Sequence, residues 1–364
     1  MPDKTRYKGN YPTDIEQAII AAMAGSPGKS LAAWVPELAV LAPAAAEPLA
    51  TWWQRARRVY PDATLKAWRC DWAVYWGFCE PRQLAPLPAT PETVAGFVLH
   101  CKEAGKKPAT VRRYLSTIAR FHRAAQLFNP CASEAVQMEV KGMTNEVSSR
   151  QRQARALGMA EIQAFLNAPG ENFPTLRERA MLCVAYDAMA RRSELITIDV
   201  EDLKFLADGT GRLLIRRSKT DQAGEGHIAY LSRQTVRHLQ AWLKRAAIKD
   251  GAVFRRIIGR GTVTYNRQGK GRIGGRLSPE AVARAFKAVA KYLKMPADEV
   301  DQVSGHSIRV GATQDLLALN IDLASVMQAG RWKTNRMPMR YGEHMMAARG
   351  GMARAAKEQG RELE

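Results

Sequence analysis

Apolar side chains recur at intervals of three and four residues along much of this chain. From residue 47 to residue 145 they form four stripes, the first built from Leu49, Trp52, Trp53 and Ala56. Such spacing places side chains on one face of a helix, which can then pack into a core. The four predicted helices begin near Glu47, Thr64, Pro91 and Pro108. The pattern therefore predicts an all-helical domain over residues 47–145.

Aromatic side chains are dense in the second of these helices, which carries Trp68, Trp72, Tyr75 and Trp76. Exposed aromatic rings can stack on DNA bases. Their helical spacing, however, is what the core of a helical bundle requires. We therefore favour a core role over base stacking.

Two stretches lack this periodicity. Prolines and glycines interrupt residues 1–46, which predicts a flexible N-terminal leader. Residues 146–158 are polar and rich in arginine, as is typical of a linker between domains. Residues 159–364 then form a second predicted domain.

Helical periodicity in the second domain is broken by short alternating runs. Helices are predicted at Met159–Asn167, Thr175–Ala190, Ser232–Ala247, Ser278–Lys294, from near Asp322, and from Met345 to about Gln359. Leu213–Ile215 and His227–Leu231 alternate on either side of a glycine-containing turn, which predicts a β-hairpin. The basic, glycine-rich segment Arg255–Arg276 predicts a mobile loop or ribbon. The fold class is mainly α with a small β-hairpin or sheet.

The net charge of +20 indicates the kind of partner. Lysine and arginine are scattered through every segment, so double-stranded DNA held in a long basic groove is favoured over a basic protein without such a partner. No apolar run is typical of a signal peptide or a membrane-spanning helix, so we expect no membrane association. The five cysteines include no C-x-x-C pair, which favours a reducing, cytoplasmic location over a disulfide or zinc framework.

The fourth predicted helix carries a row of arginines opposite its apolar stripe. Charge runs on a helix are usually solvated, but almost no acidic residue accompanies this one, which favours DNA contact. The candidates for that contact are Arg112, Arg113 and Arg120.

The segment from residue 304 to residue 341 concentrates groups that handle phosphate. His306 and Arg309 stand three apart and would share a helix face, and Trp332 and Tyr341 follow a second helical segment. A guanidinium contacts phosphate oxygens in a bidentate manner, an imidazole exchanges a proton near neutral pH, and an indole donates one N–H. The spacing predicts one site assembled from several helices, with the tyrosine as nucleophile.

This H-x-x-R…W…Y order resembles the C-terminal signature of the tyrosine recombinases, the phage integrase family. Residues 186–195, YDAMARRSEL, resemble the family's first arginine box, with Arg191 and Glu194. Residues 216–220, RRSKT, resemble its lysine-bearing hairpin, with Lys219. SGHSIRVG, MQAGRW and RRSKT are most similar to the Cre-like members, and the similarity covers roughly residue 47 to the C-terminus.

The resemblance implies a helical core-binding domain and an α+β catalytic domain that close on DNA as a C-shaped clamp. It implies a site-specific recombinase that acts on double-stranded DNA with an inverted-repeat recombination site, as a homotetramer on two DNA sites, through a Holliday junction. The last helix would dock in trans on a neighbouring protomer. The helix Ser278–Lys294, with Arg284 and Lys287, matches in position the element that enters the major groove.

The resemblance also implies a role for each candidate catalytic residue. Arg191 and Arg309 would stabilise charge on the non-bridging oxygens as phosphorus is attacked, with Glu194 holding a donor in place. Trp332 would donate its indole N–H to a phosphate oxygen.

The remaining two roles concern protons. A phenol is a poor nucleophile at neutral pH, so Tyr341 would need His306 and the neighbouring positive charge. Lys219 would protonate the departing 5′-oxygen. The resulting 3′-phosphotyrosyl bond keeps the energy of the phosphodiester, so exchange would need no ATP, metal or other cofactor.

Three alternatives come from other classes. A metal-dependent nuclease or transposase needs a carboxylate cluster, and Asp199, Glu201 and Asp202 look more typical of capping at a helix start. A type IB topoisomerase shares the chemistry but would relax DNA of any sequence as a monomer. A non-catalytic, site-specific DNA-binding protein would explain the charge but not the complete catalytic set.

Two residues depart from the family pattern. Arg192 is charged where relatives often have an apolar residue, and Arg331 replaces the small residue common before the tryptophan. Exposure to solvent would accommodate both, and neither removes a catalytic group.

Overall fold

The computed structural model describes residues 43–147, 150, 152–216, 225–258 and 272–361. The chain divides into two compact units, residues 1–151 and 152–364, and the division falls within the stretch predicted as a linker. Of the predicted leader, residues 1–42 lie outside the described residues. Across the described ranges, no helix has both the length and the apolar character needed to cross a membrane.

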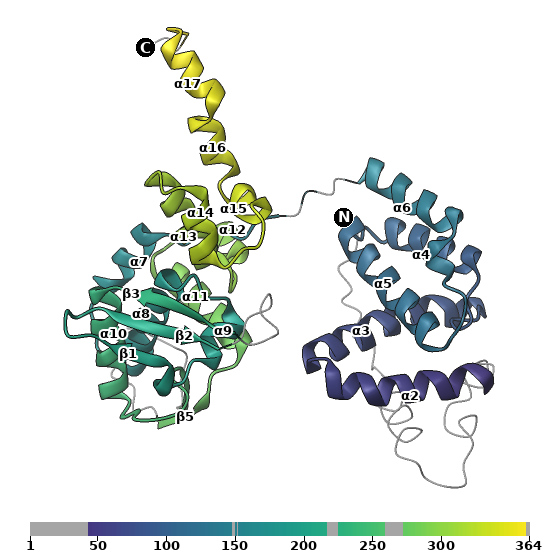
Figure 1. The fold of residues 1–364 in the computed structure, drawn as a ribbon, viewed down its shortest axis with the longest axis horizontal. Coiled ribbons are helices and arrows are strands. Elements are labelled where there is room, and N and C mark those ends of the chain that lie inside the picture. Colours follow the sequence, from purple (N-terminus) through teal and green to yellow (C-terminus); the bar gives the residue numbers. More distant parts are fainter. Residues whose placement is uncertain (1–42, 148–149, 151, 217–224, 259–271, 362–364) are drawn as a thin grey trace. The chain divides into compact units, whose positions relative to one another are not determined.

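The first unit is a bundle of α-helices (Figure 1). They are α2 (Pro43–Val59), α3 (Asp62–Cys79), α4 (Pro91–Glu103), α5 (Pro108–Ala124) and α6 (Glu134–Glu146). Proline occupies the first turn of α4 and α5, where a missing N–H costs no helical hydrogen bond. The first four helices match the predicted ones, although α2 begins at Pro43 rather than near Glu47. The pattern did not predict α6.

Aromatic residues fill the interior of this bundle. Tyr75 and Phe97 are fully buried, with ring centroids 5.1 Å apart. Trp53 and Phe121 are buried in a neighbouring cluster, against which Trp72 and other tryptophans pack. The dense tryptophans thus stabilise the bundle, in agreement with the core role favoured by their spacing.

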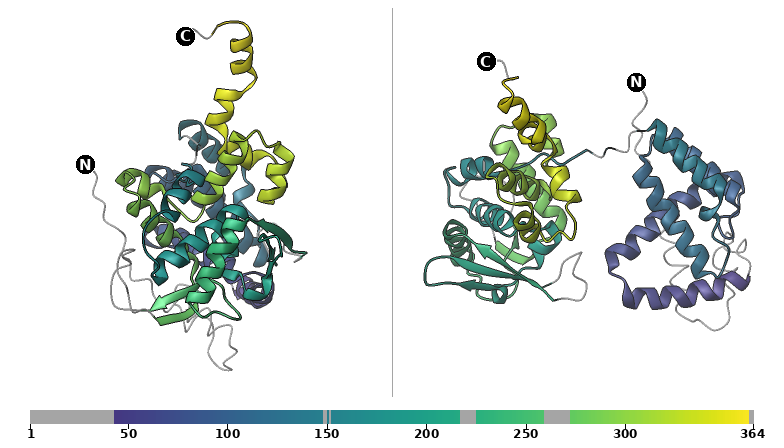
Figure 2. Two further views of the ribbon diagram at one scale, coloured as in Figure 1. Left: turned by 90° about the vertical axis from the view of Figure 1, so that its left-hand side faces the viewer. Right: turned by 45° about the horizontal axis from the view of Figure 1, so that its top comes forward.

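The second unit combines helices with two small antiparallel sheets (Figures 1 and 2). Its first helices are α7 (Met159–Leu166), α8 (Phe173–Asp187), α9 (Arg192–Thr197), α10 (Arg233–Arg245) and α11 (Pro279–Tyr292). The later ones are α12 (Ala297–Gln302), α13 (Ser307–Ala318), α14 (Leu323–Gly330), α15 (Arg336–Tyr341), α16 (Glu343–Arg349) and α17 (Gly351–Glu358). Helix α8 is buried along much of its length in the core of the unit.

The larger sheet has the order β1-β2-β3, with β1 (Leu203–Phe205), β2 (Gly211–Ile215) and β3 (His227–Leu231). Alternate residues of β2 are buried, so one face of the sheet packs on the core. The β2–β3 pair confirms the predicted hairpin, whereas the three-residue strand β1 was not predicted. The predicted loop or ribbon at Arg255–Arg276 contains a second antiparallel pair, β4 (Arg255–Ile258) and β5 (Arg272–Arg276); residues 259–271 between them lie outside the described part.

The start of α13 is fixed by the chain that enters the second unit. The main-chain N–H of Leu157 donates to the carbonyl of Ser307 at 3.0 Å. A Cβ at Gly311 would lie 2.2 Å from the carbonyl oxygen of Leu157, so only glycine allows this close approach. The N-terminal part of α13 is therefore held against the main chain of Leu157. His306 and Arg309, two of the candidate catalytic residues, lie at this end of the helix.

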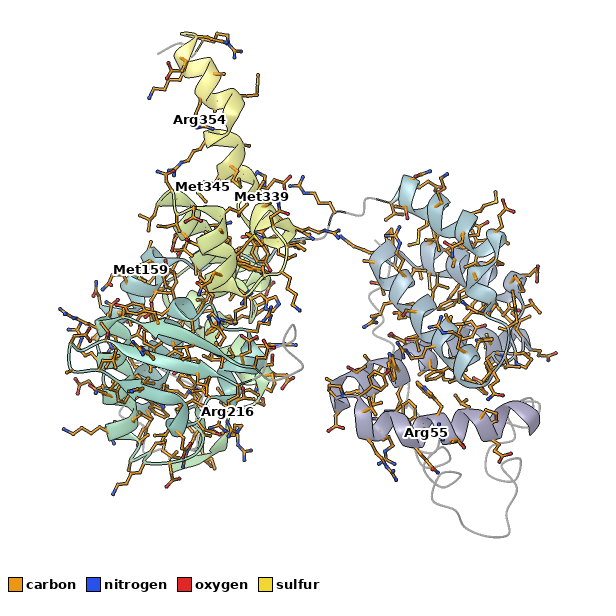
Figure 3. All side chains as sticks on the ribbon, viewed as in Figure 1. Arg55, Met159, Arg216, Met339, Met345 and Arg354 are labelled. Carbon is orange, nitrogen blue, oxygen red and sulfur yellow. The ribbon has the colours of Figure 1, made fainter. Side chains whose placement is uncertain are left out.

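The C-terminal region differs from its prediction. Two short helices, α16 and α17, replace the single helix expected from Met345 to about Gln359, and Gly350 separates them in an extended conformation. Both project from the rest of the second unit (Figure 2). Figure 3 shows Met345 on the first of them and Arg354 on the second. The side chain of Met352 is 76% exposed.

Candidate active site

Arg191 and Glu194 lie at the start of α9, just after a sharp turn. Met189 in that turn has a φ of 44°, in the left-handed region. The buried carboxylate of Glu194 accepts from the main-chain N–H of Arg191 at 2.9 Å and from its guanidinium at 2.5 Å. Arg191 is therefore the N-terminal capping residue of α9. The helix expected at Thr175–Ala190, which would have placed Arg191 directly after its C-terminus, ends earlier, at Asp187.

The side chain of Arg331 is largely withdrawn from solvent, although solvent exposure was the expected way to accommodate it. It follows α14 with a φ of 55°, and its side chain is 7% exposed. Its guanidinium donates to Glu194 at 2.7 Å and to the carbonyl of Ala188 at 2.8 Å. The expectation of solvation was wrong for Arg331 because a carboxylate and main-chain oxygens replace water around it. Arg192, by contrast, is exposed.

Helix α13 positions His306 and Arg309. His306 immediately precedes the helix and is exposed, whereas Arg309 lies in its first turn and is 3% exposed. Arg309 donates to the main-chain carbonyls of Met189 and Gly330, which ties α13 to the turn before α9 and to the end of α14. The structure thereby joins segments that are far apart in the sequence.

Trp332 connects Arg309 with Tyr341. The Arg309 guanidinium lies 4.4 Å from the centroid of the indole ring, and the phenol ring of Tyr341 lies 6.0 Å from it at 69°. A Cβ at Gly330 would lie 2.0 Å from the same indole ring, so glycine makes room for it. These contacts bring together Arg309, Trp332 and Tyr341, as the predicted multi-helix site requires.

The end of α15 is anchored by two glutamines that the sequence did not single out. The main-chain carbonyl of Tyr341 accepts from the side-chain amide of Gln314 at 2.9 Å and from that of Gln153 at 3.4 Å. Gln314 belongs to α13, whereas Gln153 belongs to the segment that enters the unit. Both glutamines bind a main-chain carbonyl, which every residue has. A sequence motif built from reactive side chains could therefore not have revealed them.

Positive charge exceeds negative charge in this cluster. The guanidinium groups of Arg191, Arg309 and Arg331 surround the carboxylate of Glu194. Burial, followed by the charges of Arg191 and Arg331, lowers the pKa of Arg309. An anion such as a phosphodiester would relieve this repulsion, so the cluster is suited to bind one.

The pKa values of Tyr341 and His306 are shifted in opposite directions. Burial raises the pKa of the Tyr341 phenol, and the charges of Arg309, Arg340 and Arg191 offset this only in part. Partial desolvation, with the charges of Arg309 and Arg191, lowers the pKa of His306. At neutral pH the phenol is therefore protonated, and the imidazole is neutral and able to accept a proton.

Lys219 lies outside the described residues, so the structure places only the strands on either side of it. Before that segment, Arg216 pairs with Asp202 at 2.5 Å. The three acidic residues considered as a metal cluster are each engaged elsewhere. Asp202 also accepts from the main-chain N–H of Asp199 at 2.9 Å, as expected for capping, Asp199 pairs with Arg276, and Glu201 accepts from a main-chain N–H.

The DNA-contact candidates lie on the surface of their helices but already have protein partners in several cases. Arg113 pairs with buried Asp71 at 2.7 Å, and Arg112 donates to Thr144 at 3.0 Å. Arg120 lies 4.5 Å over the ring of Trp68. On α11, Lys287 donates to the carbonyl of Asp301 at 3.1 Å, and Arg284 is exposed. Their contact with DNA stays a prediction.

The similarity of the chain to known proteins identifies its family. Residues 155–347 match the model of the phage integrase family. The chain belongs to this family of tyrosine recombinases. Its members break and rejoin DNA strands, so this tyrosine recombinase is an enzyme of that class.

Individual relatives are similar to this tyrosine recombinase over more of the chain than residues 155–347. An integrase/recombinase xerD homolog of Selenomonas ruminantium is 30% identical over 298 residues, which cover 79% of this chain and 83% of the relative. The recombinase cre of Escherichia phage P1 is 26% identical over 314 residues, which cover 82% and 89%. A solved transposon integrase in complex with transposon right end DNA has the same fold, with a TM-score of 0.54 at 12% identity over 86% of this chain and 98% of that one.

Proposed function

We propose that this tyrosine recombinase exchanges DNA strands at specific sites and that Tyr341 is its nucleophile. The observation that carries the proposal is the contact of Trp332 with both Arg309 and Tyr341. This contact sets the phenol of Tyr341, which must lose its proton in order to attack, beside the buried guanidinium of Arg309 in an electropositive cluster. Such a cluster favours attack on a phosphodiester, because phosphorus attack adds negative charge to the non-bridging oxygens.

Arg191 and Arg309 would hold those oxygens. Their guanidinium groups are fixed before DNA binds, Arg191 by Glu194 and Arg309 by two carbonyl oxygens, so little reorganisation is needed during the reaction. On phosphate binding, Arg309 would exchange at least one of these carbonyls for a phosphate oxygen. Trp332 would add its indole N–H.

The proton leaves Tyr341 as its oxygen bonds to phosphorus, and neutral His306 would take it up. The bond from phosphorus to the 5′-oxygen breaks at the same time, and Lys219 would supply a proton to that oxygen. The products are a 3′-phosphotyrosyl bond and a free 5′-hydroxyl. Attack by a 5′-hydroxyl from a second duplex reverses the step, and two such exchanges pass through a Holliday junction.

The assembly is part of the same proposal. Residues 47–145 would form the core-binding domain and residues 159–364 the catalytic domain, joined by the linker and closed around an inverted-repeat site. Two such sites would meet in a homotetramer, with the last helices docked in trans as in Cre-like recombinases. A net charge of +20 supports binding to double-stranded DNA.

Two alternatives differ in their products. A type IB topoisomerase would relax supercoiled DNA of any sequence as a monomer, whereas the proposed recombinase joins new partners only at its sites. A non-catalytic DNA-binding protein would form no covalent adduct. The buried Arg309 and its contact with Trp332 favour an enzyme, because binding DNA backbone alone needs only exposed positive charge.

The experiment is trapping of the covalent intermediate. Duplexes that form adducts are selected from a randomised library with the wild-type protein, and the modified residue is identified by mass spectrometry. Tyr341→Phe should bind these duplexes with unchanged affinity and form no adduct, whereas Tyr230→Phe, which alters an exposed tyrosine of β3, should behave as wild type. Adducts formed by Tyr341→Phe would overturn the assignment of the nucleophile.

A further inference from the structure

Arg331 occupies a position where arginine is costly. Its φ of 55° is a conformation that favours glycine. Its charge is also withdrawn from water, since 7% of the side chain is exposed, and a buried charge is unfavourable unless it is paired and hydrogen-bonded. A residue with both disadvantages is expected to make compensating contacts.

Those contacts are shared with the two arginines proposed to bind phosphate. Arg331 donates to Glu194 Oε2 at 2.7 Å, while Arg191 donates to Oε1 of the same carboxylate at 2.5 Å. Glu194 therefore bridges the two guanidinium groups. Loss of Arg331 would leave Glu194 Oε2 with the main-chain N–H of Arg191 as its one hydrogen-bond donor among the residues that the structure describes.

Arg331 also forms hydrogen bonds with the turn that precedes Arg191. It donates to the carbonyls of Ala188 at 2.8 Å and Met189 at 3.2 Å. Arg309 donates to the same Met189 carbonyl, so this left-handed turn is held from two sides. The contact from Arg331 to the Met189 carbonyl does not depend on Arg309 and would remain if Arg309 exchanged this carbonyl for a phosphate oxygen.

We propose that Arg331 is a positioning residue for strand cleavage: through Glu194 and the turn at Met189 it fixes Arg191 and frees Arg309 to engage the scissile phosphate. The inference rests on the proposed function, because it assigns Arg331 to the same site. It does not place Arg331 in contact with DNA.

The ionisation of Glu194 is consistent with this arrangement. Burial acts to raise its pKa, but the charges of Arg331 and then Arg191 outweigh burial, so the pKa lies below its ordinary value. His227, at the start of β3, also faces Arg331 and Glu194, and burial together with Arg331 lowers its pKa. Near neutral pH, Glu194 is therefore charged and able to bridge both arginines.

The test measures the single-turnover rate of adduct formation on duplexes selected by the wild-type protein. Arg331→Gly suits the backbone and should slow cleavage about 10- to 100-fold, by analogy with the loss of a partner that orients a metal ligand. The affinity for the duplex should change less than about threefold, because no phosphate contact is lost. Arg331→Lys keeps a charge beside Glu194 and should recover part of the rate.

A double-variant cycle separates positioning from general stability. In the Glu194→Gln background, Arg331→Gly should slow cleavage by a smaller factor than in the wild-type background, because the part of its effect that acts through Glu194 is already lost. The matched control is Arg177→Lys, which alters another buried arginine that pairs with a carboxylate and donates to a main-chain carbonyl; it should leave the cleavage rate unchanged well below its melting temperature.

Two results would overturn the inference: wild-type cleavage by Arg331→Gly, or equal slowing by Arg331→Gly in the wild-type and Glu194→Gln backgrounds. If Arg331→Gly does not fold, Arg331→Lys carries the same cycle. Failure of the wild-type protein to form any adduct would instead contradict the proposed function, so the two failures can be told apart.

Discussion

The indole ring of Trp332 meets the phenol ring of Tyr341 nearly edge to face, with ring centroids 6.0 Å apart and ring planes at 69°. Arg309 lies 4.4 Å from the centroid of the same indole. Trp332 can therefore act in two ways, as a spacer that sets Tyr341 relative to Arg309 and as a donor to phosphate. Substitutions that retain one property and remove the other distinguish these contributions.

Trp332→His should retain the most activity, because imidazole keeps an N–H donor and a flat ring. Trp332→Phe keeps a ring but loses the donor, and a hydrogen bond to a charged group is worth about 1.5–3 kcal/mol, so cleavage should slow at least about tenfold. Trp332→Ala loses both and should be slowest. Single-turnover cleavage rates give the order, and a Phe variant as fast as wild type would exclude the donor role.

Gly330→Ala should disable cleavage without weakening DNA binding. The new Cβ would lie 2.0 Å from the Trp332 ring, which would have to move away from Tyr341 and Arg309. We expect a loss of cleavage of at least about tenfold, since small displacements in an active site are costly. Gly351→Ala is the matched control, because a Cβ there meets nothing within 4 Å. Equal rates for the two variants would contradict the packing role.

Local pattern was sufficient for much of this fold. The stripes of α3, α4 and α5, the β2–β3 hairpin and the start of α14 at Asp322 follow from periodicity and capping. It failed for α6, which is polar over much of its length and is stabilised by packing of Val136, Val140 and Met143. It also failed at Gly350, because a methionine-rich stripe does not show where the chain breaks between two short helices.

The sequence predicted those residues of the candidate site whose side chains have an evident role in phosphate chemistry. Arg191, Glu194, Arg309, Trp332 and Tyr341 are brought together in the structure. Arg331 could not be placed, because its burial depends on Glu194, 137 residues earlier in the chain. Nothing in the sequence around Arg331 distinguishes an arginine that faces water from one that faces a distant carboxylate.

His122 should make the first unit sensitive to acid. Its Nε2 accepts from the main-chain N–H of Ala89 at 2.9 Å, so Nδ1 carries the proton that is donated to Ile118. Burial lowers the pKa of His122. The unfolded chain therefore binds a proton more readily, and the stability from neutral His122 is present above about pH 6.5 and is lost as the pH falls toward the folded-state pKa.

His122→Gln keeps an acceptor for Ala89 but cannot titrate. Its free energy of unfolding should depend less steeply on pH between about 5 and 6.5, by up to ~1.4 kcal/mol per pH unit, the value for one proton. Urea unfolding followed by tryptophan fluorescence provides the measurement, because the tryptophans of α2 and α3 report on this unit. Parallel slopes for the two proteins would show that His122 is not the sensitive group.

Deletion after Gly342 should separate site binding from synapsis. The truncated chain keeps Tyr341 but lacks α16 and α17, whose methionines include Met352 at 76% exposure. If these helices dock on a neighbouring protomer, single sites should still be bound while complexes of two sites disappear. Sedimentation of protein–DNA complexes distinguishes these species. Met352→Gln should weaken synapsis in the same direction, and normal recombination by the truncated protein would refute docking in trans.

Lys219 allows a test based on the leaving group. Removal of Lys219 should slow cleavage whether the lysine only contacts phosphate or protonates the 5′-oxygen. Replacement of the bridging 5′-oxygen by sulfur separates them, because a thiolate leaves without a proton. Lys219→Ala should therefore cleave ordinary DNA very slowly, and its cleavage rate should recover substantially on the sulfur substrate.

Arg309→Ala provides the contrast on the same two substrates. Its defect concerns charge on the non-bridging oxygens, which the sulfur substitution leaves in place. Arg309→Ala should accordingly stay slow with both. The measured quantity is the ratio of single-turnover cleavage rates on the sulfur and oxygen substrates, compared with the ratio for the wild-type protein. Equal rescue of the two variants, or rescue of neither, would remove Lys219 from the role of general acid and leave it as a residue that positions the phosphate.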